Sequence, residues 1–103
     1  MKKIDKNLIY GHSPEIIARQ IEETLVIVPL ISGIGKLDED LFSLNDTGKL
    51  IWEMLDGKSN VRDVIQKIST NYEENVIIIE NDVIELLQML LDKELIIEIR
   101  DSV

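Results

Sequence analysis

Few side chains in this 103-residue chain could carry acid–base or metal chemistry. His12 is the only histidine and there is no cysteine, so one chain cannot assemble a histidine-assisted nucleophile, a thiolate site or a multi-histidine metal site. Asp38, Glu39 and Asp40 could approach a hard cation, but they lack the ligand spacing of a calcium-binding loop. We therefore expect an acidic turn at these residues, and no catalytic residue, metal site or cofactor in the protein.

Two glycine-containing segments share features with nucleotide-binding loops. Gly57-Lys58-Ser59 matches the end of a phosphate-binding P-loop, but Trp52 stands where that motif has its first glycine. The segment 33–36, Gly-Ile-Gly-Lys, is too short for a dinucleotide-binding fingerprint. Ordinary turn and helix-end chemistry explains both segments, with Gly57 placed directly after a helix.

The composition restricts the partners that the protein can have. A formal net charge of −9 disfavours nucleic acids and anionic membranes, whose binding depends on Lys and Arg. The longest apolar run, 25–31, contains Pro29 and is far shorter than the roughly 20 residues that span a bilayer. The N-terminal residues have no apolar signal-peptide region, so we expect a cytoplasmic location with no nucleic-acid or membrane partner.

The first half of the chain predicts a small antiparallel sheet. Apolar segments at Ile16–Ile21 and Leu25–Leu30 are separated by a short polar loop, which is hairpin spacing, and Pro29 belongs near a strand end. After a glycine-containing, acidic turn, Leu41–Leu44 is a third short strand. Residues 1–13 show no sustained period, so we interpret them as a flexible arm before a single domain at 14–103.

The second half predicts three helices. Asn45 caps a helix over Asp46–Asp56, and Ser59 or Asn60 caps a second helix that ends at Asn71 and Tyr72. A third helix covers about Asn81–Lys93, with Asp82 as its cap. We read the four β-branched residues 76–79 before it as an extended connector, and Leu95–Ile99 as a terminal strand or wing. The fold class is α+β, a three-stranded antiparallel β-meander followed by three helices.

A series of short motifs occurs along the chain in a characteristic order and spacing. The motifs, in chain order, are Leu44-Asn45, Thr47-Gly48, Ile51-Trp52, Asp56-Gly57, Asp82-Val83, Leu87, Leu90 and Leu95. This series resembles the PqqD family of peptide chaperones, also called RiPP recognition elements, where RiPP means ribosomally made and post-translationally modified peptide. The resemblance covers about 16–97, and the family's fold is a three-stranded sheet followed by a three-helix winged-helix-like unit.

The resemblance implies a binding mechanism. The leader of a precursor peptide would lie along the third strand as an added antiparallel strand, with its side chains in a groove beside the third helix. A modifying enzyme such as a radical SAM protein or a peptidase would be the second partner. The longer connection at 31–40 leaves open whether this edge is covered. The peptide-binding residues implied are Leu41, Phe42, Ser43, Leu44, Asp82, Val83, Leu86, Leu87 and Leu90.

Two other functions remain open at this stage. Three helices and a terminal hairpin could form a winged-helix transcriptional regulator, although Glu80, Asp82, Glu85 and Asp92 on the third helix, against Lys93 alone, would repel phosphate. Alternatively, the free strand could pair with a second copy, which would make the protein a small interaction module or homodimer.

Overall fold

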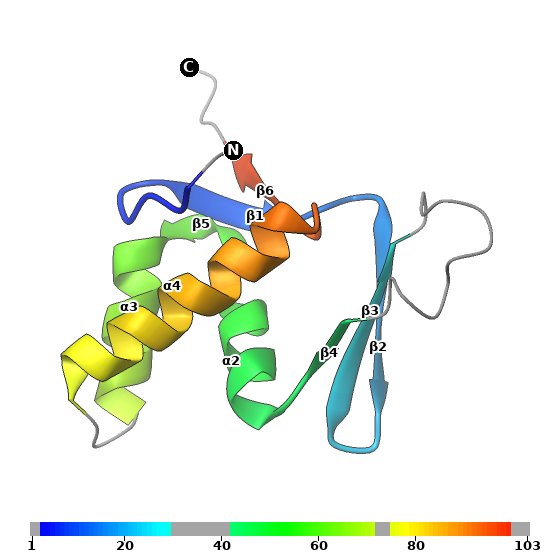
Figure 1. Ribbon diagram of the computed structural model, residues 1–103, viewed down its shortest axis with the longest axis horizontal. Helices are drawn as coiled ribbons and strands as arrows, with labels where there is room; N and C mark the ends of the chain where they lie inside the picture. Colours follow the sequence, from blue (N-terminus) through cyan, green and yellow to red (C-terminus); the bar gives the residue numbers. More distant parts are fainter. Residues whose placement is uncertain (1–2, 30–41, 72–74, 100–103) are drawn as a thin grey trace.

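The computed structural model of the protein describes residues 3–29, 42–71 and 75–99. Within these residues the chain forms two small antiparallel sheets and three helices, whose arrangement Figure 1 shows. The expected α+β class, with a three-stranded antiparallel meander followed by three helices, is confirmed. The elements are β1 (Ile9–His12), β2 (Ile16–Ile21), β3 (Thr24–Pro29), β4 (Phe42–Leu44), α2 (Asp46–Met54), β5 (Asp56–Asn60), α3 (Val61–Asn71), α4 (Val76–Asp92) and β6 (Ile96–Ile99).

The first meander has the strand order β2-β3-β4. The predicted hairpin is confirmed: β2 and β3 pair from Ile16 opposite Pro29 to Ile21 opposite Thr24, so Pro29 stands at the strand end. Glu22 takes a φ of 57° in the tight connection. The outer ends predicted for these strands, Leu30 and Leu41, lie outside the described residues.

The face of this sheet that packs on the helices follows the two-residue period of a strand. Leu25 and Ile27 are buried, and they lie opposite Leu44 and Phe42 of β4. Val26, between them, points to the other face and is half-buried. The register therefore places Phe42 and Leu44 on the core side of the sheet and Ser43 on its outer side.

A second sheet, with the order β5-β1-β6, corrects the prediction of a flexible arm at 1–13. Its central strand, β1, pairs Ile9 with Asn60 on one side and with Ile99 on the other. Tyr10 is 2% exposed, and Asp5 donates its backbone N–H to the Tyr10 hydroxyl over 3.1 Å. The arm was mistaken for a disordered segment because its partners are distant in sequence.

The segment before β1 also supplies hydrogen bonds that α3 needs. The first backbone N–H groups of a helix have no partner inside the helix. Here Val61 donates to the carbonyl of Leu8, Arg62 donates to that of Lys6, each over 3.1 Å, and Asp63 donates to the side chain of Asn60 over 2.8 Å. The predicted Asn60 cap is thus present, with two N-terminal carbonyls completing it.

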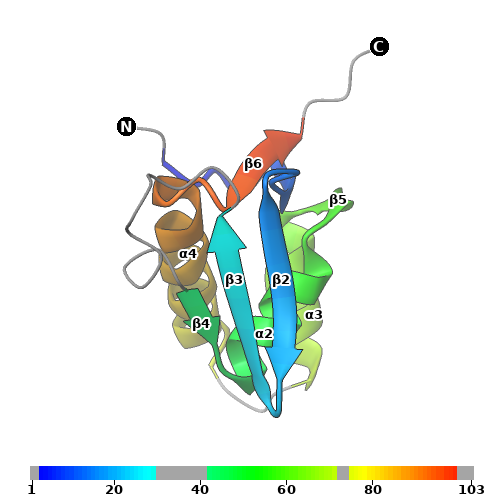
Figure 2. The same ribbon diagram turned by 90° about the vertical axis from the view of Figure 1, so that its right-hand side faces the viewer.

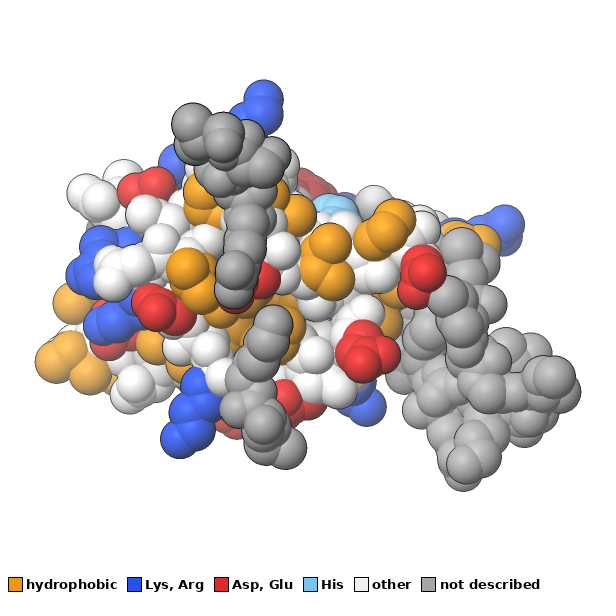
Figure 3. All heavy atoms as spheres, turned by 90° about the horizontal axis from the view of Figure 1, so that it is seen from above, with side chains coloured by type: hydrophobic (Ala, Val, Ile, Leu, Met, Phe, Trp, Pro, Cys, Tyr) orange, Lys and Arg blue, Asp and Glu red, His pale blue; other side chains and the backbone are white. Residues whose placement is uncertain are grey.

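The outward face of β1 and β6 in the second sheet is apolar. Ile97 is 39% exposed, with Ile9 and Ile99 half-buried on the same face. Gly11 makes room here, because a Cβ at its position would lie 3.1 Å from Ile99 Cγ1. Figure 3 looks onto this end of the molecule and shows hydrophobic side chains gathered near the middle, with the pale blue imidazole beside them.

The end of α2 differs from its prediction. The helix ends at Met54 with Leu55 as its C-cap, and Asp56 begins strand β5. Gly57 takes a φ of 78° within that strand and is not the residue directly after the helix. The Asp56 carboxylate accepts N–H groups from Lys58 and Ser59, which holds the backbone in this turn-like conformation.

The start of α4 is also corrected. Residues 76–79, expected as an extended connector, form its first turn, because the Asn75 side chain accepts the N–H of Ile77 over 2.8 Å. Asp82 lies two turns inside the helix and is exposed, so it is not the cap. Terminal strand β6 is confirmed within Leu95–Ile99. Within the described residues, no helix is long and apolar enough to cross a membrane.

Replacing Tyr10 with alanine should destabilise the fold by about 3–5 kcal/mol, since a buried aromatic ring of the central strand is lost. Tyr10→Phe should cost only about 1 kcal/mol, because it removes the hydroxyl alone. Urea denaturation of both variants checks this. A Tyr10→Ala protein as stable as the unmodified one would show that the N-terminal segment is undocked in solution.

The Asp56 carboxylate should make stability depend on pH in acid. The N–H groups of Lys58 and Ser59 lower the pKa of Asp56 below its usual value. The unfolded chain then binds the proton first, so this stabilisation is present at neutral pH and is lost as the pH falls through the folded pKa. Asp56→Asn should flatten the acid limb of a stability–pH profile. An unchanged limb would contradict this assignment.

Candidate functional site

Strand β4 presents an unpaired edge. It lies at one end of the order β2-β3-β4, so it pairs only with β3, through Phe42 opposite Ile27 and Leu44 opposite Leu25. No strand in the described parts of the chain covers its other edge. Figure 2 shows β4 at the margin of the sheet, with α4 running behind it. Unpaired N–H and C=O groups on such an edge can bind an added strand.

Helix α2 fixes the position of β4 from below. The side chain of Asn45, which follows the strand, accepts the N–H of Gly48 over 2.9 Å and caps the helix. Gly48 is buried, and a Cβ there would lie 3.2 Å from the Leu44 Cβ and 3.0 Å from its Cδ2. The absence of a side chain at Gly48 therefore allows the helix to pack directly on the strand.

One corner links α4 to the sheet that contains β4. Ser13, between β1 and β2, donates its N–H to the carbonyl of Leu95 over 3.0 Å. Leu95 in turn donates to the carbonyl of Leu90, over 2.9 Å, at the end of α4. The end of the helix and the start of the hairpin are thus held together by backbone hydrogen bonds.

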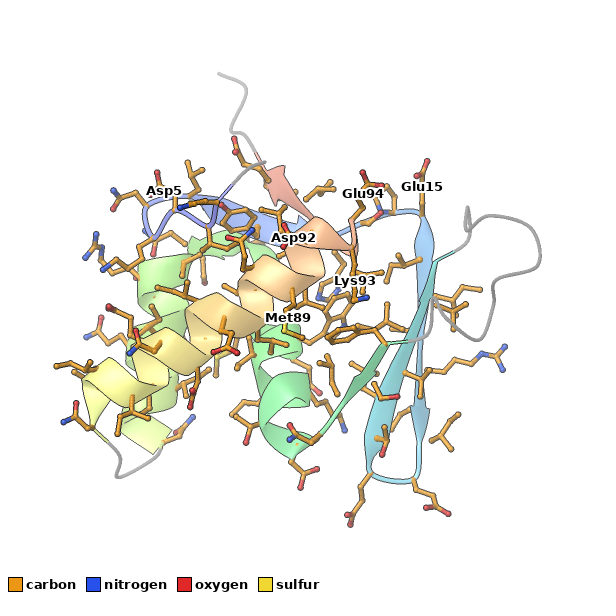
Figure 4. The ribbon with its side chains drawn as sticks, viewed as in Figure 1. Asp5, Glu15, Met89, Asp92, Lys93 and Glu94 are labelled. Carbon is orange, nitrogen blue, oxygen red and sulfur yellow. The ribbon has the colours of Figure 1, made fainter. Side chains whose placement is uncertain are left out.

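A stripe on α4 faces the region beside β4. Leu86, Met89 and Lys93 recur at spacings of three and four, so they share one side of the helix. Met89 is 43% exposed and Leu86 is half-buried. The ammonium of Lys93 lies over the Phe42 ring, 5.8 Å from its centroid. Figure 4 shows Met89 and Lys93 on the side of the helix turned toward β4.

The residues implied by the resemblance fall into two groups. Phe42 is half-buried, Ser43 is exposed, Leu86 is half-buried and Asp82 is exposed, so a partner can contact their side chains. Leu41 lies outside the described residues. The remaining four are core residues between 0% and 3% exposed, and the protein itself covers their side chains: Leu44, Val83, Leu87 and Leu90.

The resemblance did not include Met89 or Lys93. The signal that could have found them is helical spacing, since Leu86 lies three residues before Met89 and Met89 lies four before Lys93. A helix pattern alone does not say which margin of the apolar stripe faces the neighbouring sheet. The docking of α4 on the rest of the fold decides this.

His12 is exposed but lies at the end of strand β1, not in a flexible arm. Its ring stacks on Trp52 with the centroids 3.8 Å apart and the planes 5° apart. His12 Nε2 lies 2.7 Å from the carbonyl oxygen of Trp52. Because a carbonyl only accepts, Nε2 carries the proton. Trp52 is 4% exposed, so it belongs to the core.

The chemistry available at this site is binding chemistry. Among residues 3–29, 42–71 and 75–99, no three His, Asp or Glu side chains come together as a metal site would need. The side chains beside β4 are an aromatic ring, aliphatic groups, a thioether and an ammonium. These groups, together with a free backbone edge, suit an extended peptide.

Comparison with known proteins agrees with this arrangement. The model of the PqqD family, described as coenzyme PQQ synthesis protein D, matches residues 22–96. The chain belongs to the PqqD family. Its fold is similar to that of TbiB1, solved in complex with the TbiA(beta) leader peptide, with a TM-score of 0.71 and 23% identity over 88% of this chain and 99% of that one. No curated protein matches the sequence.

The PqqD-family match runs from the hairpin tip at Glu22 to the first residue of β6, Ile96. It therefore includes β4, α2 and α4, which form the candidate site, and it leaves out β1, β2 and all but the first residue of β6. In this PqqD-family protein, β1 and β2 are two of the six strands in the two described sheets.

Replacing Gly48 with alanine should disturb β4 in this PqqD-family protein. Alanine is the better helix former by about 1 kcal/mol, yet its Cβ would push against the Leu44 Cβ, which the strand backbone holds. We expect a net loss of about 1 kcal/mol from overpacking, with shifted amide resonances at Phe42 and Ser43.

The neighbouring variant Thr47→Ala is the control, because Thr47 is exposed in the same turn. It should leave the β4 resonances and the free energy of unfolding nearly unchanged. Equal behaviour of the two variants would show that the packing of Gly48 on Leu44 does not position the strand.

Proposed function

We propose that this PqqD-family protein is a non-catalytic peptide chaperone. It binds the leader of a ribosomally made precursor peptide and presents it to a modifying enzyme. The observation that carries the proposal is the unpaired edge of β4, which has the stripe of Leu86, Met89 and Lys93 beside it. Support comes from TbiB1, a structure of similar fold that was solved with a leader peptide.

In this proposal the leader becomes a fourth strand, antiparallel to β4. Backbone hydrogen bonds to the free edge supply affinity that does not depend on sequence. Alternate leader side chains then lie on the same side as Phe42 and Leu44, toward α4, and the others lie beside Ser43. The half-buried Leu86 and the exposed Met89 offer apolar surface to the first set, so they select among leaders.

The second partner supplies the chemistry. A leader held in an extended form leaves the rest of the precursor free to enter an active site, and we propose a radical SAM protein or a peptidase as the enzyme.

A homodimer formed through β4 would occupy the same edge as the leader. Peptide binding and dimerisation would therefore compete, and sedimentation with and without leader peptide would reveal this.

The test uses synthetic leader peptides of candidate precursors encoded in neighbouring genes. Adding the matching leader to the labelled protein should shift the amide resonances of Phe42, Ser43 and Leu44 and of α4. Met89→Lys should weaken binding about tenfold, since the apolar stripe then carries a second ammonium that must lose water. Calorimetry with each variant gives the dissociation constant.

The matched control is Ile77→Lys, on the same helix but in its first turn, where Ile77 is 64% exposed. It should leave affinity unchanged. N-methylation of the peptide, one amide at a time, should weaken binding at every second residue, because a strand bonds its neighbour through alternate residues. Resonance shifts confined to other elements, or methylation effects without this period, would reject strand addition at β4.

A further inference from the structure

Among the described residues, Lys93 is the cation that lies over an aromatic ring. It is the C-cap residue of α4, and it forms no ion pair with any carboxylate among the described residues, in contrast to Lys6, which pairs with Glu80 at 3.5 Å. Its ammonium lies over the ring of Phe42 instead. A cation over an aromatic face is attracted to it, so the side chain is held beside the free strand.

The charges near Lys93 make it a local exception. The other charged residues of α4 are Glu80, Asp82, Glu85 and Asp92, and the chain as a whole carries −9. A lysine at a helix C-terminus complements the helix dipole, but that role does not require its side chain to lie over β4. The direction of the side chain is therefore informative, because it sets one positive charge on the binding edge of an acidic protein.

The geometry of an added strand defines what this charge would meet. The guest residue opposite Phe42 has its side chain on the same side of the sheet, with Cβ atoms about 5 Å apart. Lys93 stands above that ring, at 5.8 Å. A carboxylate on the guest residue would thus reach the ammonium, while the lysine stem stays on the ring.

We propose that Lys93 selects precursor peptides that carry Asp or Glu at the position paired with Phe42. This inference rests on the proposed function and adds the chemistry of one leader residue. The preference is local, since charges more than about 8 Å away are largely screened at physiological salt. The overall negative charge therefore does not prevent it.

The experiment selects binders from a displayed library of random peptides, using the folded protein and three variants. The unmodified protein should enrich peptides with Asp or Glu at one aligned position. Lys93→Glu should enrich Lys or Arg there, and Lys93→Met, which keeps the stem on Phe42, should show no charge preference. Lys58→Glu is the control, since it changes the net charge equally on β5, away from β4 in Figure 2.

A selected peptide then gives the magnitude. Replacing its acidic residue by the matching amide should weaken binding to the unmodified protein about three- to tenfold, the range of a partly exposed ion pair. The same replacement should have no effect on Lys93→Met, and added salt should remove the difference.

The outcomes separate the two proposals. One outcome is that the selected peptides shift the β4 resonances and yet show the same charge preference with the unmodified protein, Lys93→Glu and Lys93→Met. That result would overturn the role of Lys93 and leave leader binding intact. If the Lys58→Glu control changed the charge preference as well, the net charge of the protein would explain the preference. That result would also overturn the role of Lys93. Selections that yield no peptide acting on β4 would contradict the proposed function itself.

Discussion

The pairing of β1 with both β5 and β6 is the constraint on which the rest of the structure depends. One four-residue strand joins the segment after α2 to the segment after α4. The residues before it complete the first turn of α3 through the carbonyls of Lys6 and Leu8. Ser13, just after it, bonds to Leu95 at the end of α4. A single short strand thus sets the relative positions of the helices and of the hairpin.

The candidate site is a consequence of that arrangement. The β4 edge and the stripe on α4 come from segments about forty residues apart, and they share no hydrogen bond among those described. Their spacing is set by the Ser13 to Leu95 link on one side and by the Gly48 to Leu44 contact on the other. In the second link the Leu44 side chain is buried, 3% exposed, although its backbone belongs to β4. The exposed side chains beside the edge can therefore change without altering the contacts that place the strand.

The sequence predicted local features well and distant ones poorly. The hairpin was predictable because Ile21 and Thr24 pair across a two-residue connection, and Asn45 and Asn60 are visible caps of α2 and α3. Strand β1 was not, because its partners lie some fifty and ninety residues away and four residues give no sustained period. At 76–79, β-branched composition suggested an extended segment, but the Asn75 cap and the burial of Ile79 favour a helix.

The site was predictable only to the level of its elements. The resemblance pointed to the third strand and the third helix, and the structure has a strand at Phe42–Leu44 and a longer helix than expected at Val76–Asp92. Within α4, however, the three- and four-residue spacing of a helix predicts that Val83, Leu87 and Leu90 share an apolar face. It does not separate the residues that fill the core from those at the margin of the apolar face. The orientation of Met89 and Lys93 toward β4 follows from how the helix docks on the sheet, which depends on contacts from the whole chain.

The place of β1 in its sheet also bears on how the protein is made. Residues 9–12 are synthesised early, yet one of their partners is residues 96–99. The emerging chain cannot close this sheet until those residues have left the ribosome. Until then the Ile-Tyr-Gly-His segment can pair only with residues 56–60, and its other edge stays open to chaperones and to other nascent chains.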